Sequence, residues 1–352
     1  MRIAILGTGA IGFGAAALLT EQGHRPVLWS PSGTGAAALA AGEPLEASGA
    51  LTGRYPVEVA ADAQAAVTGA EVVMLALPAY GHRAVLDAVL PHLAAGQTVL
   101  FSGHLSFAAL YLAQRLAERD LYLPIVVWGT TVTSGRRTGP AAVRMNIRAK
   151  VDVASLPAGD TGLALSQALF GDRFVPRDDL IAIALSNVNP QNHMAIALCN
   201  LTRMERGESW AQNENITDAG GRLIEALDAE RLAIAAAFGA TVRTVREHFH
   251  LSFHIPEAPL GEMARAMAAK GDRTLAPATL ETRYVLEDVP FGLAPTVLLA
   301  RLAGIATPLH NGGIALLSAL YGRDLAAAND ILPTLGLAGM TSDQLRARVR
   351  RA

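Results

Sequence analysis

Short apolar runs alternate with helix-like stretches through the first half of the chain. Each run is bounded by glycine, proline or polar residues, as expected for strands that are buried on both faces of a parallel sheet. The predicted strands are residues 2–6, 25–29, 71–77, 97–101 and 123–128, and the predicted helices between them are residues 10–22, 81–93 and 106–119. This alternation predicts an α/β fold with a doubly wound parallel sheet of the Rossmann type.

Four further segments of the first half have weaker patterns. Residues 45–60 predict one or two short strands, and residues 130–139 predict a polar loop. Residues 142–147 and 150–156 are expected to be strands that close the sheet. A short helix and a strand then complete this part of the chain, up to about residue 178.

Strand patterns nearly vanish in the second half. The predicted helices are residues 180–186, 193–206, 218–238, 261–268, 295–303 and 311–320. Thr341 and Gln344 have the spacing of a capping box that starts one last short helix. We therefore expect an N-terminal Rossmann domain over residues 1–179, followed by an all-helical C-terminal domain over residues 180–352.

Composition narrows the class of protein. The chain has 352 residues, of which 51% are hydrophobic and 17% charged, with a net charge of −2, so no basic surface for nucleic acid is expected. No apolar window is long enough to span a membrane, and the early glycines argue against a secretory signal. Cys199 is the single cysteine, which fits a reducing cytoplasm. The alanine-rich pattern of residues 218–238 predicts core packing or a homodimer interface.

The first strand ends in a glycine motif of the form GxGxxG. Gly7 permits a tight turn, Gly9 lets a pyrophosphate approach the backbone, and Gly12 allows close packing of helix on strand. Ala10 and Ile11 lie at the start of the following helix, where free N–H groups and a partial positive charge favour phosphate. Because the motif stands between a predicted strand and a predicted helix, it predicts a dinucleotide site.

The second strand bears on which nicotinamide cofactor binds. An acidic residue at its end would select NAD(H), but Ser30 and Ser32 stand there instead. No arginine is adjacent to them, and Arg54 is the basic residue that could reach a 2′-phosphate. This favours NADP(H) slightly over NAD(H). Leu77-Pro78 and Ser102 end the next two strands, where contact with the cofactor and a simple turn are equally good interpretations.

Two polar segments stand out in the helical half. His193 follows Pro190 in an early turn of a predicted helix, and a histidine suits proton transfer at neutral pH. Arg283 offers a planar group for a carboxylate, and Asp288 suits the orientation of an imidazole. Taken singly, a structural histidine and a helix-end salt bridge are the better interpretations. Only when the two segments are considered together do they indicate a functional site.

Cys199 and the histidines at 248, 250 and 254 are further candidates for chemistry in the helical half. Residues 248 and 250 share a face only if the segment is extended, whereas 250 and 254 share one most closely if it is helical. A polar segment near the substrate cleft is therefore expected in preference to a metal site. Buried packing is expected for Cys199.

The order of these motifs resembles the NAD(P)-dependent opine dehydrogenases, the octopine/nopaline dehydrogenase family. The matching motifs are the N-terminal GxGxxG, Leu77-Pro78, Asn189-x-x-x-His193, residues 200–205, residues 283–290 and Thr307-Pro308. Together they span nearly the whole chain. The ending of the second predicted strand departs from family members that carry an acid there, which leaves the cofactor open.

The resemblance implies a reductive condensation. An amino acid and a 2-oxo acid such as pyruvate form an imine, which NAD(P)H reduces to an N-carboxyalkyl amino acid. His193 would be the acid/base, Asp288 would orient it, and Arg283 would bind the oxo-acid carboxylate. Asn189 would bind the carbonyl or the nicotinamide amide, or simply contact the helix start. The alternatives are a 2-oxo acid reductase of the ketopantoate reductase type and a catalytically silent NAD(P)-binding sensor.

Overall fold

The computed structural model describes residues 1–351 and forms two compact units. The first unit is Met1–Ile183 together with the C-terminal residues from Ala347, and the second is Ala184–Arg346. Residue 179, where the sequence placed the domain boundary, therefore lies four residues before the end of the main segment of the first unit. None of the helices within residues 1–351 combines the length and apolarity needed to cross a bilayer.

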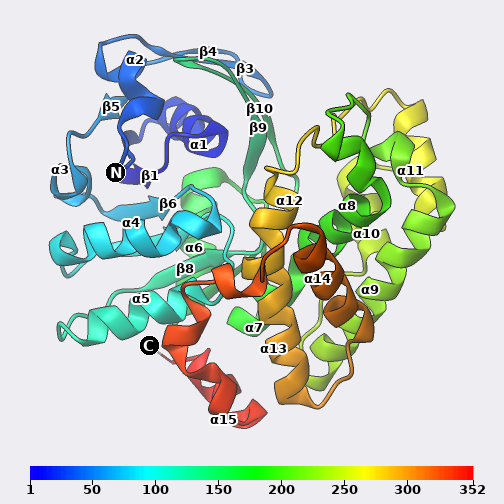
Figure 1. The fold of residues 1–352 in the computed structure, drawn as a ribbon. Coiled ribbons are helices and arrows are strands. Elements are labelled where there is room, and N and C mark those ends of the chain that lie inside the picture. Colours follow the sequence, from blue (N-terminus) through cyan, green and yellow to red (C-terminus); the bar gives the residue numbers. More distant parts are fainter. Residues whose placement is uncertain (352) are drawn as a thin grey trace. The chain divides into compact units, whose positions relative to one another are not determined.

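An eight-stranded sheet forms the centre of the first unit (Figure 1). Its strands, in order across the sheet, are β12 (Phe174–Pro176), β11 (Val151–Leu156), β8 (Ile125–Trp128), β7 (Thr98–Phe101), β6 (Val72–Leu75), β1 (Arg2–Leu6), β2 (Arg25–Trp29) and β5 (Glu58–Val59). All neighbours are parallel except β11 and β8, which are antiparallel. The predicted Rossmann sheet is thereby confirmed, with two strands at one edge, β11 and β12, that run opposite to the other six.

The order of the strands sets the place for a ligand. The chain runs from β1 to β2 on one side and returns with β6 on the other, so the direction of winding reverses between β1 and β6. Ligands of such sheets bind beyond the carboxyl ends of the strands at this point.

The helical segments of the unit are α1 (Ala10–Glu21), η1 (Thr34–Ala36), α2 (Ala37–Ala40), α3 (Ala63–Val67), η2 (Ala79–Gly81), α4 (His82–Val89), η3 (Leu90–His92), α5 (Ala108–Ala117) and α6 (Thr161–Phe170).

A second, four-stranded sheet corrects two of the expectations. Its order is β4 (Gly53–Tyr55), β3 (Leu45–Gly49), β10 (Ala142–Ile147) and β9 (Thr133–Gly139), and it curves over α1 in Figure 1. The expected polar loop at 130–139 is largely the strand β9, and 142–147 does not close the main sheet. Only one face of the second sheet is covered, so Val143 and Met145 of β10 are buried while Arg144 and Asn146, which alternate with them, are exposed. In a strand with only one covered face, apolar and polar residues alternate. The residues of β9 are so polar that their sequence resembles that of a loop.

The second unit is helical, as predicted, and no strand occurs within its residues 184–346. Its segments are α7 (Leu180–Ser186, which begins in the first unit), α8 (Asn189–Glu205), η4 (Asn213–Asn215), α9 (Asp218–Ala237), α10 (Val245–Phe253), α11 (Leu260–Ala269), α12 (Arg283–Leu286), η5 (Val289–Leu293), α13 (Ala294–Ala303), α14 (Pro308–Leu320), η6 (Ala326–Ala328), η7 (Leu332–Leu335), η8 (Leu337–Gly339) and α15 (Ser342–Arg348). The predicted capping box is present: the Thr341 hydroxyl accepts from the Gln344 N–H at 3.2 Å, and the Gln344 side chain accepts from the Thr341 N–H at 2.8 Å.

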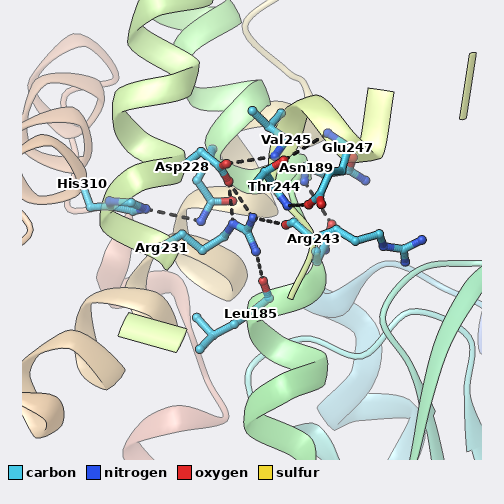
Figure 2. A network of polar contacts seen from close by, with 11 residues as sticks. Leu185, Asn189, Asp228, Arg231, Arg243, Thr244, Val245, Glu247 and His310 are labelled. Carbon is cyan, nitrogen blue, oxygen red and sulfur yellow. Dashed lines mark hydrogen bonds and ion pairs between the residues drawn. The ribbon is translucent and has the colours of Figure 1, made fainter. Parts of the chain in front are cut away.

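A buried arginine organises the polar interior of this unit (Figure 2). Arg231 is fully buried, pairs with Asp228 at 2.6 Å and donates to the carbonyls of Leu185 and Arg243. Asp228 also accepts from the N–H of Val245 at 2.9 Å. These bonds tie the end of α7 and the start of α10 to α9. Since a buried charge that loses its partner is costly, the network specifies how these helices pack.

Candidate functional site

His193 and Asp288 meet in the helical unit although 95 positions separate them in the chain. The Nδ1–H of His193 donates to Oδ2 of Asp288 at 2.6 Å, and both side chains are largely buried. A carboxylate that accepts from Nδ1 fixes the tautomer, so that the lone pair of the neutral ring lies on Nε2. The pair can therefore exchange a proton through Nε2.

The start of α8 places His193. The N–H of Asn189 donates to the side chain of Asn187 at 3.0 Å, and Pro190 occupies the first turn. In the same turn, the side-chain amide of Gln191 donates to Nε2 of His310 at 3.3 Å. This last bond joins the polar network drawn in Figure 2. The first turns of α8, from which His193 projects, are therefore held on two sides.

A close approach of two segments places Asp288. It is the N-cap of η5, a π-helical turn that packs against α8. A Cβ on Gly292 would lie 2.5 Å from Cγ of Pro190, so only glycine allows η5 to come this near. The spacing of Arg283 and Asp288 did not reveal this contribution, because the contact joins residues that are far apart in sequence.

Tyr284 is a member of the site that sequence reasoning missed. Its ring lies parallel to the His193 ring, with 3.6 Å between the centroids and 9° between the planes. Its hydroxyl donates to the side chain of Gln212. Burial and, to a lesser degree, Asp288 raise the pKa of Tyr284 to about 12 against the opposing charge of Arg283, so the phenol stays neutral. The only signal in the sequence was its place between Arg283 and Asp288 in one segment.

Arg283 begins α12 and pairs with Glu287 one turn later. Glu287 is buried, whereas the side chain of Arg283 is 64% exposed. The helix-end salt bridge weighed from the sequence therefore exists, with Glu287 as the partner. It does not exclude a substrate role, because a carboxylate that holds Nε sets the plane of the guanidinium.

The glycine motif of the first unit divides into two kinds of position. A Cβ on Gly7, whose φ is +136°, would overlap the Ala76 carbonyl, and one on Gly12 would overlap the Gly7 carbonyl. No atom lies within 4 Å of the Cβ position at Gly9. Gly7 and Gly12 are thus required for packing, whereas Gly9 leaves open space in front of the N-terminus of α1.

The loop after β2 lies against this motif. The Thr8 hydroxyl donates to Ser30 Oγ at 3.1 Å, and Ser32 Oγ lies 3.1 Å from the hydroxyl of Thr34. Arg54 instead pairs with Glu46 within the second sheet at 3.3 Å.

Arg137 of β9 is the basic residue that lies beside the motif. It donates to the carbonyls of Thr8 and Gly35, at 3.2 and 2.5 Å, and its guanidinium lies 4.3 Å from the centre of the Phe13 ring. Sequence reasoning missed it because β9 was expected to be a loop.

The segments after β6 and β7 combine apolar residues with neutral polar ones. Leu77 and Pro78 follow β6, and the Leu77 carbonyl accepts from Nε2 of the buried His82 at 3.2 Å. Ser102 follows β7, and its buried hydroxyl has no hydrogen-bond partner among residues 1–351. Burial lowers the pKa of His82 to about 4 and that of His104 to about 3, so both imidazoles are neutral near pH 7.

Two remaining expectations concern reactive side chains. The expectation of buried packing for Cys199 is wrong: the residue is exposed, since the buried face of α8 is formed by other positions, among them Ala197 and Asn200. The histidines at 248 and 250 lie within α10 and His254 caps its end, with Nδ1 of His250 bonded to the Ile255 carbonyl at 2.6 Å.

Comparisons with known proteins find similar sequences for both parts of the chain. A family model described as NAD/NADP octopine/nopaline dehydrogenase, alpha-helical domain, matches residues 176–321, and one described as NADP oxidoreductase, coenzyme F420-dependent, matches residues 2–100. The chain is 31% identical over 355 residues to an opine dehydrogenase of Arthrobacter sp. (strain 1C), with 98% of each chain covered.

Two kinds of solved structure share the fold. An octopine dehydrogenase with NADH and L-arginine matches with a TM-score of 0.80 and 16% identity, covering 99% of this chain and 98% of the other. A yersinopine dehydrogenase with NADP+ bound matches with a TM-score of 0.72 and 15% identity, covering 99% and 97%.

Proposed function

Since the chain belongs to the octopine/nopaline dehydrogenase family, we propose that His193, Asp288 and Arg283 perform the chemistry of that family here. The protein is an NAD(P)-dependent opine dehydrogenase: the amine of an amino acid condenses with a 2-oxo acid, and reduction of the imine gives an N-carboxyalkyl amino acid. The observation that carries the assignment of roles is the 2.6 Å bond between His193 and Asp288.

His193 exchanges the protons of the condensation at Nε2. Protonated there, it gives a proton to the departing oxygen of the oxo acid, and in the reverse reaction it takes one from the amine side. Asp288 stabilises the imidazolium and keeps Nδ1 as a donor in both states. Arg283 pairs with the carboxylate of the oxo acid, and Glu287 sets the plane of its guanidinium. Asn189, at the start of α8, hydrogen-bonds the substrate carbonyl or the nicotinamide amide.

The residues for the dinucleotide are those of the glycine motif and the neighbouring strand ends. They are Gly7, Gly9, Ala10, Ile11, Gly12, Ser30, Ser32, Leu77, Pro78 and Ser102. The open space at Gly9 and the unpartnered hydroxyl of Ser102 support this assignment. When bound, the nicotinamide supplies the hydride that reduces the imine. Since Ser30 and Ser32 stand where an acid would exclude a 2′-phosphate, NADP(H) is the preferred cofactor.

The test follows oxidation of NADPH and of NADH with pyruvate alone and with pyruvate plus each of a panel of amino acids. We expect turnover only with both substrates, and a lower KM for NADPH than for NADH. Turnover with the oxo acid alone would favour a ketopantoate-type reductase, and cofactor binding without any turnover would favour a sensor.

A pair of histidine variants tests the role of His193. His193→Gln should lower kcat by roughly a hundred- to ten-thousand-fold, the range for a lost general acid/base, without changing dinucleotide affinity. His254→Asn, an exposed histidine of the same unit, is the control. Equal activity of the two variants would exclude His193 as the acid/base.

Location and assembly complete the proposal. The single cysteine supports a cytoplasmic location, which fractionation of cells would test. A homodimer stays a prediction that sedimentation equilibrium would test.

A further inference from the structure

The stacked ring of Tyr284 is not accounted for by proton transfer between His193 and Asp288 alone. We propose that Tyr284 is a positioning residue, which holds His193 in its catalytic orientation and favours the protonated imidazolium, and that Gln212 fixes Tyr284 in turn. This inference rests on the proposed role of His193 as the acid/base, and it adds a residue to which sequence reasoning gave no role.

Two contacts at right angles define the orientation of the imidazole. Asp288 holds one edge through Nδ1 at 2.6 Å, which still permits the ring to rotate about that bond. Tyr284 covers one face, with centroids 3.6 Å apart and planes 9° apart, and this removes the rotation. With both contacts in place, the direction of Nε2 is fixed.

The same contact acts on the charge of the ring. A cation over the face of an aromatic ring is attracted by its quadrupole, and the attraction grows when the pair is shielded from water. The side chain of His193 is only 19% exposed, so the contact is largely shielded. Because burial raises the pKa of Tyr284 to about 12, the phenol remains neutral when His193 is protonated.

Other charged groups around this pair must be considered as well. Asp288 at the start of η5 and Glu287 at the end of α12 are acidic, and Arg283 of α12 opposes them. From α9 and α14, the hydrogen-bonded pair of Glu230 and His310 reaches α8 at Gln191, two positions before His193. A substitution at Tyr284 leaves all of these in place, so its effect on His193 can be measured separately.

The hydroxyl of Tyr284 serves a second purpose. It donates to Oε1 of Gln212, and the backbone N–H of Gln212 donates to the Thr274 carbonyl at 2.9 Å. Beside Gln212, the Trp210 ring donates to the Pro277 carbonyl at 3.0 Å. The position of the stacked ring is therefore fixed by segments outside α8 and α12, and a phenylalanine would keep the ring while losing this tether.

The experiment is an NMR titration of the histidine ring protons in the full-length protein. The His193 signals are assigned by their loss in His193→Gln. In Tyr284→Leu we expect the His193 titration to move to lower pH by roughly half to one pH unit, which is the size of a cation–π contact. Tyr284→Phe should titrate close to the unsubstituted protein. Tyr321→Leu, which removes a tyrosine of the same unit with its bond to the Leu280 carbonyl, is the control for loss of packing.

The outcomes separate this inference from the proposed function. A titration that is unchanged in Tyr284→Leu, or that moves equally in Tyr321→Leu, would overturn the role of Tyr284 whether or not the protein turns over. In the activity assay, Tyr284→Leu should lower kcat more than it raises KM, and Tyr284→Phe should recover most of kcat. Absence of turnover in the unsubstituted protein would contradict the proposed function but would leave the titration result valid. A melting curve for each variant confirms that the compared proteins are folded.

Discussion

The dinucleotide loop of the first unit and the proton-transfer site of the second are built on different principles. Gly7, Gly9 and Gly12 lie within six positions of one another, and what they contribute is the space left by missing side chains. His193 and Asp288 are separated by 95 positions, and what they contribute is a directed hydrogen bond. The first site depends on glycines that let a ligand or a neighbouring segment approach the backbone closely. The second site depends on side chains that hold the imidazole of His193 in one orientation. Substitutions should therefore fail in different ways at the two sites.

The largest effect is expected for Asp288→Asn. An amide can present its NH2 group to Nδ1, which selects the wrong tautomer and removes the charge that stabilises the imidazolium, so kcat should fall by roughly a hundred- to ten-thousand-fold. Single-turnover and steady-state kinetics would measure the loss, and fluorescence titration with NADPH should show unchanged affinity. Asp343→Asn, with a side chain that is 87% exposed, provides the matched control. A fully active Asp288→Asn would mean that the bond to His193 has no part in proton transfer.

A pair of glycine variants tests the other side of the comparison. Gly9→Ala adds a Cβ where no atom lies within 4 Å, so its melting temperature should stay nearly unchanged while dinucleotide affinity falls by roughly ten- to a hundredfold. Gly12→Ala adds a Cβ against the Gly7 carbonyl, so it should destabilise the protein by roughly 1–3 kcal/mol, the cost of overpacking. Calorimetry and NADPH titration of both variants measure the two effects.

The reverse result would contradict this division of roles. If Gly9→Ala bound NADPH as tightly as the unsubstituted protein, the open space in front of α1 would not be where the pyrophosphate lies. If Gly12→Ala were fully stable, the close approach of α1 to the Gly7 carbonyl would not be required.

The same contrast explains what could be predicted from the sequence. The parallel strands and the glycine motif are local patterns, and the structure contains them where they were expected. Strand β9 was missed because one face of its sheet is exposed and its residues are polar. His193, Asp288 and Arg283 were recognised only through the resemblance to a family, since each alone has an ordinary structural explanation.

The residues that were missed share one property. Tyr284 and Gly292 act on residues about 90 or more positions away, and Arg137 acts on Thr8 at a separation of 129 positions. No periodicity within a single element encodes such contacts, because they depend on how the elements pack. Reasoning from one sequence therefore finds the ends of strands and helices more readily than the side chains that orient a catalytic group.

The smallest effect is expected where the first site does use a side chain. Ser30 begins the loop after β2 and lies beside Thr8, with 3.1 Å between the two hydroxyls. In Ser30→Asp, a carboxylate would repel a 2′-phosphate and accept from the ribose hydroxyl of NADH, so the preference for NADPH over NADH should fall by roughly tenfold. The measurement is the ratio of kcat/KM for the two cofactors. Ser48→Asp introduces the same charge at an exposed serine of β3 and should leave the ratio unchanged. If Ser30→Asp also left the ratio unchanged, cofactor choice would not be made at the end of β2, and the proposed preference for NADP(H) would lose the residues on which it rests.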